Sequence, residues 1–242
     1  MDNKLEIVIT MGGRGERFRR RGYNVPKFMI KAKGKTLFEW SMLSLIGFME
    51  NANKFIFIAL KDPDNDVEKF IRQNCKKLNI ENYNVILLEE LTDGQATTAM
   101  YAQNFWKEEN PLLVYNIDTY VEPYEMNFSQ MKGDGFIPCF KAPGNHWSFV
   151  RLDDNGNVVE IKEKERISDN CTIGAYYFKT CKLYKELYNT LYGTNISDKE
   201  KYIAPLYDIL ISEGGEVFIS DINPQKVHVL GTPEELDYFI NN

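Results

Sequence analysis

The sequence predicts an α/β protein built on a mixed, mostly parallel sheet with helices on both faces. Two features of the 242-residue chain lead to this expectation. The first half alternates apolar, β-branched runs with helical patterns, which is the rhythm of parallel strands joined by crossover helices. The second half carries closely spaced strands and a hairpin signal, so antiparallel strands should join the sheet there. Hydrophobic residues make up 43% of the chain, which is enough for a substantial core.

The first half supplies the expected parallel strands, which are apolar runs at residues 5–10, 54–60, 84–88 and 111–115. A helix should begin at Thr36, because Glu39 three residues later completes a capping box. Its apolar face is expected to continue as far as Met49. A second helix should follow Asp64 or Asp66, either of which can cap it.

The second half adds strands at residues 134–140, 147–152, 157–161, 171–178, 216–220 and 226–230. Residues 153–156, Asp-Asp-Asn-Gly, predict the hairpin that joins two of them. Helices should begin after Thr180 and near Pro205, and the second should end at Gly214-Gly215. The chain is therefore expected to form one continuous α/β unit.

A glycine-rich stretch directly after the first strand is the clearest candidate site. It consists of Met11, Gly12, Gly13, Arg14 and Gly15, followed by Arg17 and, behind Pro26, by Lys27. Glycines allow the backbone to bring its N–H groups against an anion, and guanidinium or ammonium groups pair with phosphate oxygens. The stretch lacks the Gly-Lys-Ser/Thr ending of a P-loop and the third glycine of a dinucleotide fingerprint. We interpret it as a polyphosphate site, with a solvated basic turn as the alternative.

Two further segments place polar groups where ligands bind in open α/β sheets. Asp118 follows the strand at 111–115, and a carboxylate at the end of a parallel strand suits magnesium. Residues 91–100, LTDGQATTAM, open a helix with small residues that leave room for a flat ring against the backbone. The structural alternatives are a turn or cap aspartate in the first case and tight packing of a helix on the sheet in the second.

Together these segments resemble the sugar-phosphate nucleotidyltransferases. The matching positions, in order, are Gly13, Gly15, Arg17, Pro26 and Lys27, then 93–98, Asp118, Glu163-Lys164, Gly174 and 231–234. The resemblance implies a Rossmann-like, single-domain nucleotidyltransferase fold over residues 1–242. It also implies a nucleotide-binding half at 1–125 and an acceptor-binding half at 126–242. The implied reaction transfers a nucleoside monophosphate from a nucleoside triphosphate to a small phosphorylated acceptor and releases pyrophosphate.

The resemblance also assigns roles to individual residues. The implied catalytic residues are Arg17, Lys27 and Asp118. Nucleotide binding falls to Met11, Gly12, Gly13, Arg14, Gly15, Gly94, Gln95 and Thr98, and acceptor binding to Trp147, Glu163, Lys164 and Gly174. Magnesium is the implied cofactor, held by Asp118. The family commonly has a second aspartate where this chain has Val229, so Asp221 is our candidate for the second ligand, with Asn223 as an alternative. A further alternative is a metal held by Asp118 and phosphates with more water.

The match extends to the capsule-biosynthesis branch of the family through Gly22-Tyr23 and residues 147–150, Trp-Ser-Phe-Val. This branch implies CTP as the nucleotide and phosphoglutamine as the acceptor. We expect the cations Lys141, Arg151, Lys162, Lys164 and Arg166 to favour such an additionally charged acceptor. For all of them except Lys164, a merely solvated charged face of the hairpin is the alternative. The alternatives are a sugar-1-phosphate transferase that uses UTP, GTP or dTTP, and a non-catalytic nucleotide-binding regulatory protein. An NAD-dependent reductase is disfavoured by the incomplete fingerprint.

Composition excludes several other classes. The net charge of −6 argues against nucleic acid as a partner, and no apolar run is long enough to span a membrane. The four cysteines have no metal-type spacing and the N-terminus has no signal-peptide pattern, so we expect a cytoplasmic location. The sequence leaves a homo-oligomer open.

Overall fold

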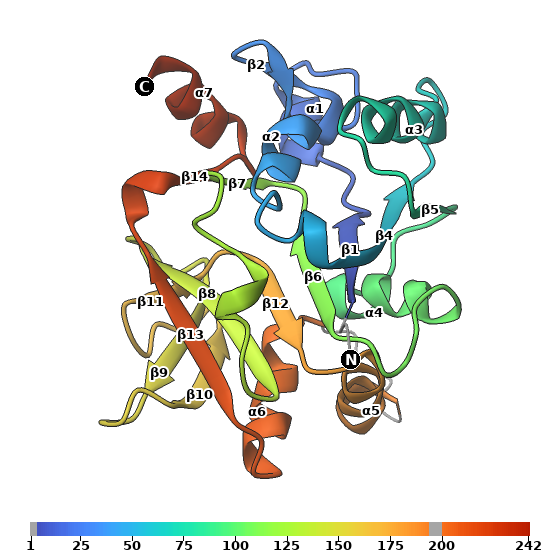
Figure 1. Ribbon diagram of the computed structural model, residues 1–242. Coiled ribbons are helices and arrows are strands. Elements are labelled where there is room, and N and C mark those ends of the chain that lie inside the picture. The colour runs from blue at the N-terminus through green and yellow to red at the C-terminus, as the bar shows by residue number, and fades with distance from the viewer. Residues whose placement is uncertain (1–3, 194–199) are drawn as a thin grey trace.

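A ten-stranded mixed sheet forms the centre of the computed structural model, which describes residues 4–193 and 200–242 (Figure 1). The strands of this sheet are β1 (Leu5–Met11), β4 (Ala52–Leu60), β5 (Tyr83–Leu88), β6 (Leu112–Asn116), β8 (Gly135–Lys141), β9 (Ser148–Leu152), β10 (Val158–Glu163), β11 (Asn170–Thr172), β12 (Ala175–Phe178) and β13 (Val217–Ile222). Their order is β10-β9-β11-β8-β12-β6-β1-β4-β5, and β13 pairs with β8.

The two halves of the chain contribute different kinds of pairing. Strands β6, β1, β4 and β5 are parallel to one another, as the alternation of strands and helices predicts. Strand β12 runs antiparallel to both β6 and β8, and so joins this part to the hairpin-rich part. Two short ribbons complete the strands, β2 (Lys31–Ala32) with β3 (Lys35–Thr36) and β7 (Thr119–Val121) with β14 (Val227–Val229).

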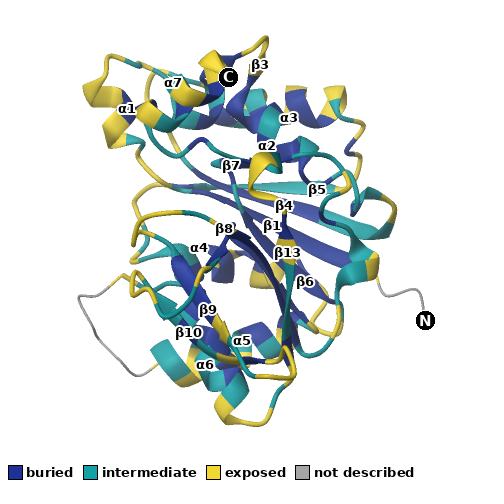
Figure 2. Ribbon diagram, turned by 90° about the vertical axis from the view of Figure 1, so that its left-hand side faces the viewer, coloured by how far each residue is buried: buried dark blue, intermediate teal, exposed yellow. Residues whose placement is uncertain are grey.

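Helices cover both faces of the sheet, as expected. They are α1 (Glu16–Arg20), α2 (Leu37–Leu43), α3 (Val67–Lys77), α4 (Gln95–Met100), α5 (Cys181–Tyr192), α6 (Ala204–Ser212) and α7 (Pro233–Asn241). Strand β1 shows the division: Ile7 and Ile9 face the core under α2 and α3, whereas Val8 faces the core under α4, α5 and α6. Figure 2 shows the buried strands between these helical layers. A strand buried on both faces must be apolar throughout, which explains the unbroken apolar run of β1.

Most predicted elements are confirmed, and two differ. The strand expected at 171–178 is broken into β11 and β12, because Gly174 between them has a left-handed φ of +81°. The helix that begins after Thr36 has the expected capping box but ends at Leu43 instead of continuing to Met49. The chain turns there so that Gly47 can lie against the backbone of Met126 and bridge to Asn127.

Candidate active site

The glycine-rich loop leads directly from β1 into the short helix α1. Gly15 precedes the helix with a φ of +63°, a conformation that favours glycine. Buried Phe18 anchors the helix in a small core beneath α2 and α7. Three nearby arginines are used in ion pairs: Arg19 with Asp62 at 2.6 Å, Arg20 with Glu16, and Arg21 with Asp237. Among the described residues, Arg14 and Arg17 have no such carboxylate partner, so their charges are available to a ligand.

A lysine–aspartate pair lies beside this loop. Lys27 Nζ is 2.5 Å from Asp118 Oδ2, and the two side chains are 15% and 26% exposed. Lys27 is held in place by the turn that follows Pro26 and by its buried neighbour Phe28. Asp118 follows β6, as predicted. A side chain at Gly15 would contact the Cβ of Lys27 at 3.4 Å, so the glycine lets the lysine pass close to the loop.

A cavity of about 560 Å³ opens next to this pair and brings together predicted site residues from both halves of the chain. Those that line it are Arg17, Gln95, Asp118, Trp147, Glu163 and Gly174. They come from both halves of the chain, and several follow the carboxyl ends of strands, where open α/β sheets bind their ligands. A smaller hollow between Arg17 and Lys27 continues from it past Gly231.

A second hollow of about 300 Å³ shares Gln95, Asn116 and Asp118 with this cavity. Gly12, Gly13, Gly94 and Thr98 also line it, which places the glycine loop opposite the segment at 91–100. Two predicted nucleotide-binding side chains lie elsewhere. The Met11 side chain is buried in the core, so only its backbone is available to a ligand, and Arg14 borders another hollow, which Asp62 and Glu89 also line.

Hydrogen bonds give the segment at 91–100 a fixed shape. Gln95 donates to Thr10 Oγ1 at 3.0 Å, and the Thr98 hydroxyl contacts Thr92 Oγ1 at 2.6 Å and donates to the Gly94 carbonyl. Gly94 itself packs against backbone, since a Cβ would lie 2.3 Å from the Lys201 carbonyl oxygen. The predicted small residues therefore serve tight packing as well as leaving an open hollow.

The opposite wall of the large cavity is built from strands β9, β10 and β12 and their loops. The Glu163 carboxylate accepts a hydrogen bond from Ser148, and the hydroxyls of Tyr176 and Thr172 lie 3.1 Å apart. Burial raises the pKa of the Glu163 carboxyl above its ordinary value and that of Tyr176 to about 12. Gly174 lies against Asn116, where a Cβ would be only 2.1 Å from the side-chain nitrogen.

Each of the five cations expected to surround the acceptor has a partner within the protein. Arg151 pairs with Glu160 at 2.5 Å, Lys162 with Asp208 at 3.4 Å, and Lys141 with Asn170. Lys164 donates to the Tyr202 hydroxyl at 2.5 Å, and this hydrogen bond raises the pKa of the lysine. None of the five is among the described residues that line the cavity. The expectation that they surround it is wrong, because each cation has found a partner within the protein.

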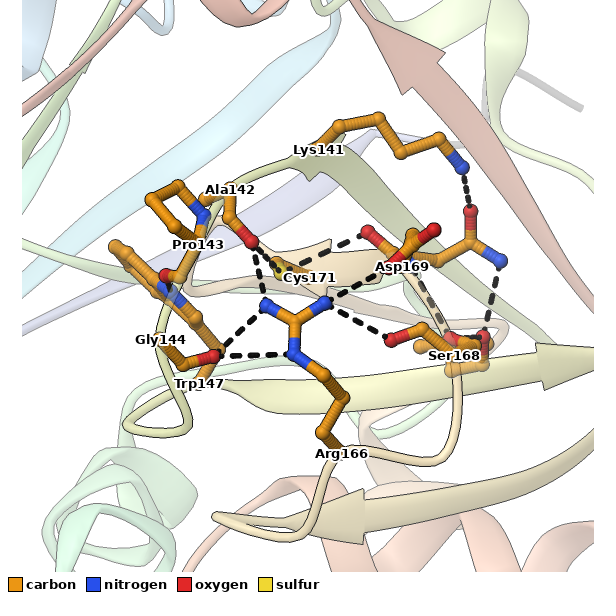
Figure 3. A network of polar contacts seen from close by, with 11 residues as sticks. Lys141, Ala142, Pro143, Gly144, Trp147, Arg166, Ser168, Asp169 and Cys171 are labelled. Carbon is orange, nitrogen blue, oxygen red and sulfur yellow. Dashed lines mark hydrogen bonds and ion pairs between the residues drawn. The ribbon is translucent and has the colours of Figure 1, made fainter.

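Arg166 has a structural role that its charge alone did not reveal (Figure 3). Its guanidinium donates to the carbonyls of Ala142 and Gly144 at 2.6 and 2.8 Å, and to Asp169 Oδ1 at 2.9 Å. It also lies over the Phe149 ring at 4.7 Å. These contacts hold the loop that carries His146 and Trp147, whose rings lie 4.3 Å apart at the cavity wall.

The structure does not bring Asp221 to Asp118. Asp221 is exposed on β13, which pairs with β8, and it does not line the cavity. Asn223 caps a 3₁₀ turn. In the described parts of the chain, no group of three or more histidine, cysteine, aspartate or glutamate side chains could hold a metal ion. The structure places another carboxylate beside Asp118, that of Glu235 of α7, which sequence reasoning missed: both lie next to Gly231 and line the same cavity.

The comparisons with known proteins agree with this geometry. The sequence profile described as "Nucleotidyl transferase" matches residues 6–199. The chain belongs to this family. One relative, the bifunctional protein GlmU of Methanocaldococcus jannaschii, is 24% identical over 86% of this chain and 47% of its own length. A putative mannose-1-phosphate guanyltransferase of Sulfolobus acidocaldarius is 23% identical over 80% of this chain and 52% of its own length. The chain thus spans about half the length of these two relatives.

Solved structures share the nucleotidyltransferase fold over nearly the whole chain. The nucleoside-diphosphate-sugar pyrophosphorylase from Vibrio cholerae RC9 is 32% identical, with a TM-score of 0.88 over 98% of this chain and 100% of that one. The inositol-1-phosphate CTP transferase from T. maritima is 17% identical, with a TM-score of 0.77 over 97% and 92%. The second likeness concerns the fold alone. No helix in the described residues is long and apolar enough to cross a membrane.

Proposed function

We propose that this chain transfers cytidine monophosphate from CTP to the phosphate group of a small acceptor of the phosphoglutamine type, and releases pyrophosphate. The observation that carries the transfer is the Lys27–Asp118 pair, which lies between a glycine loop and a cavity large enough for an acceptor. The choice of CTP, phosphoglutamine and capsule precursor synthesis rests on the capsule-branch motifs at Gly22-Tyr23 and 147–150.

The reaction needs no nucleophile from the protein. An oxygen of the acceptor phosphate attacks the α-phosphorus, the bond from that phosphorus to the bridging oxygen of the β-phosphate breaks, and pyrophosphate leaves with the electron pair. The product carries a new diphosphate linkage. Catalysis then depends on holding the two phosphates in line and on stabilising the charge that develops.

The residues around the loop fit these two tasks. Backbone amides from Met11 to Gly15 and the guanidinium of Arg17 would hold the β- and γ-phosphates. Lys27 would neutralise charge at the α-phosphate, to which it is directed by Asp118 and the adjacent glycine loop. Gly94, Gln95 and Thr98 would form the wall against which the base and ribose lie.

A magnesium ion fits the donor chemistry of the site. Asp118 offers a carboxylate at the strand end, and magnesium accepts one or two carboxylates together with substrate phosphates and water. When bound, the ion would supply charge neutralisation on the phosphate oxygens. One carboxylate oxygen of Asp118 pairs with Lys27. The magnesium ion and the lysine ammonium would therefore compete for this oxygen, or each would bind one of the two oxygens.

The residues that would recognise the acceptor are not the five cations that the sequence suggested. Glu163 lines the cavity and can accept from an ammonium or amide N–H, while Trp147 offers a flat apolar face. Arg17 and His146 are the basic side chains that line the cavity in the described part of the chain. Because Arg17 is assigned to the nucleotide phosphates, His146 would be the one to hydrogen-bond a carboxylate of the acceptor. Gly174 would contribute its backbone to this wall, and Lys164 would support the wall through its hydrogen bond to Tyr202, which lines the cavity.

The test is the initial rate of pyrophosphate release with CTP, UTP, GTP, dTTP and ATP, each offered with phosphoglutamine and with hexose and heptose 1-phosphates. We expect CTP with phosphoglutamine to be fastest. A preference for UTP, GTP or dTTP with a sugar 1-phosphate would reject the proposed substrates and leave the transfer mechanism intact. Tight binding of a nucleotide with no release of pyrophosphate from any pair would favour the non-catalytic regulatory alternative.

A further inference from the structure

Glu235, in the first turn of α7, has a carboxylate oxygen for which the described part of the chain offers no partner. Its Oε2 atom is buried, yet it has no hydrogen-bond partner among the described residues. Burying a charged oxygen without a partner is unfavourable, and buried polar atoms in native proteins are nearly always satisfied. The described polypeptide therefore leaves this oxygen free to accept a group from outside the chain.

The helix could have satisfied this carboxylate internally. In α2, the sequence Thr36-x-x-Glu39 forms a reciprocal capping box, in which Glu39 Oε2 accepts from the Thr36 backbone N–H at 2.8 Å. Helix α7 has the same spacing, and Thr232 accepts from the Glu235 backbone N–H at 3.2 Å. The Glu235 side chain does not make the return bond to Thr232. The two Thr-x-x-Glu motifs thus share the bond from the glutamate N–H to the threonine and differ in where the glutamate side chain points.

The Glu235 carboxylate instead borders the space beside Asp118. A Cβ placed on Gly231 would lie 3.4 Å from Asp118 Oδ2 and 3.5 Å from Glu235 Oε2. The absence of a side chain at Gly231 therefore leaves an open position that touches both carboxylates. Glu235 and Asp118 also line the same cavity, together with Val229.

Other charges on α7 point away from this position. Glu234 is 74% exposed and pairs with Arg21 at 3.7 Å, and Asp237 pairs with the same arginine at 3.0 Å. Lys27, the cation at the site, contacts Asp118 and not Glu235. Glu235 is thus the acidic side chain of this helix that is directed at the site and left without a counter-ion there.

We propose that Glu235 and Asp118 together bind the divalent cation that accompanies the nucleoside triphosphate, with Glu235 as the second carboxylate ligand. This inference rests on the proposed function, because the remaining ligands would be phosphate oxygens and water. Two carboxylates with several waters is a coordination that magnesium accepts readily. Glycine at position 231 leaves room for this cation, since any larger residue would fill the position between the two carboxylates.

The test is a Mn²⁺ titration followed by electron paramagnetic resonance, with and without inorganic pyrophosphate, so that no turnover and no choice of base is involved. We expect Glu235→Gln to weaken Mn²⁺ binding about tenfold or more, the scale on which metal sites respond to loss of a supporting group. Glu234→Gln, its exposed neighbour, is the matched control and should bind Mn²⁺ like the parent. Gly231→Ala keeps both charges and fills the space between them, so it should weaken binding as well.

A rescue variant makes the test sharper. Val229 lines the same cavity and pairs with Thr119, so Val229→Asp in the Glu235→Gln background should restore Mn²⁺ affinity at least in part. Parent-like Mn²⁺ binding by both Glu235→Gln and Gly231→Ala would overturn the proposal, as would absence of Mn²⁺ binding by the parent. If Glu235→Gln fails to fold, Gly231→Ala decides alone. A Glu235-dependent Mn²⁺ site in a protein that releases no pyrophosphate from any substrate would uphold this inference and reject the proposed function.

Discussion

Lys27→Ala is the substitution whose effects on turnover and folding follow most directly from the structure. The lysine is half of a partly buried ion pair, and its ammonium is held at the junction of the glycine loop and the cavity. Its removal takes away a positioned charge without opening a large hole in the core. We therefore expect a strong effect on turnover and a smaller effect on folding.

The two effects can be estimated separately. Loss of one preorganised charge-stabilising donor costs about 2–4 kcal/mol of transition-state stabilisation, or about a 30-fold to 1,000-fold loss in kcat. For folding, exposed ion pairs contribute about 0–1 kcal/mol and removal of one partner from a fully buried pair costs about 3–5 kcal/mol. With side chains 15% and 26% exposed, this pair lies between these limits, so we expect a loss of about 1–3 kcal/mol in the free energy of unfolding.

The assay is pyrophosphate release at saturating substrates, together with urea unfolding of the same preparations. Asp118→Ala and the double variant complete a mutant cycle, and the double variant should lose less stability than the sum of the singles because the pair is direct. A folded Lys27→Ala protein that retains more than a third of parental kcat would refute the proposed catalytic role. Additive losses of stability would refute the ion pair as an energetic unit.

Three other predictions concern the cavity wall. Gly174→Ala should raise the acceptor KM and lower the free energy of unfolding more than Gly156→Ala does. Both glycines have a φ of +81°, but only at Gly174 would a Cβ clash with a neighbouring side chain. Arg166→Ala should raise the acceptor KM about tenfold with little change in the nucleotide KM, since it frees the loop shown in Figure 3, whereas Arg151→Ala should change neither by more than twofold. Burial raises the pKa of the Glu163 carboxyl, so the native state holds its proton more tightly than the unfolded state does. The ionised residue therefore destabilises the native state once the pH rises above 4.5, the ordinary pKa of this carboxyl. The melting temperature of Glu163→Gln relative to the parent should therefore increase between about pH 4 and pH 7.

Each of these predictions has a result that would contradict it. Equal losses in the two glycine variants would show that backbone strain alone matters at Gly174. An unchanged acceptor KM in Arg166→Ala would mean that the loop keeps its shape without the guanidinium. A difference in melting temperature that does not vary with pH would remove the Glu163 carboxyl as a titrating group of the native state.

The fold was largely predictable because its signals are local. Apolar runs in β1, β4 and β6 and the capping box at Thr36 are set by neighbours in sequence, and all four are confirmed. The break between β11 and β12 was not predictable in the same way. It depends on Gly174 meeting Asn116 from a distant strand, and no local pattern reports that contact.

The sequence predicted the site residues that the backbone positions. It did not predict which partners the charged side chains would contact. Arg17 and Asp118 reach one cavity because a loop and a strand end bring them there. The basic residues of the second half look alike in sequence, but in the structure Arg166 donates to loop carbonyls and Lys162 pairs with Asp208. Glu235 was missed because its spacing is that of an ordinary cap, and only the structure shows which way its carboxylate points.

The most direct test of the central claim is to follow the α-phosphorus of CTP by ³¹P NMR during a reaction with phosphoglutamine, in the parent and in Asp118→Asn. We predict that the α-phosphorus signal moves to that of an asymmetric diphosphate linked to the acceptor, with one pyrophosphate formed for each acceptor consumed. Asp118→Asn should slow this conversion and raise the magnesium concentration it needs. Formation of free CMP or CDP in place of the linked product, or no change in the spectrum with any nucleotide and acceptor in the panel, would contradict the account.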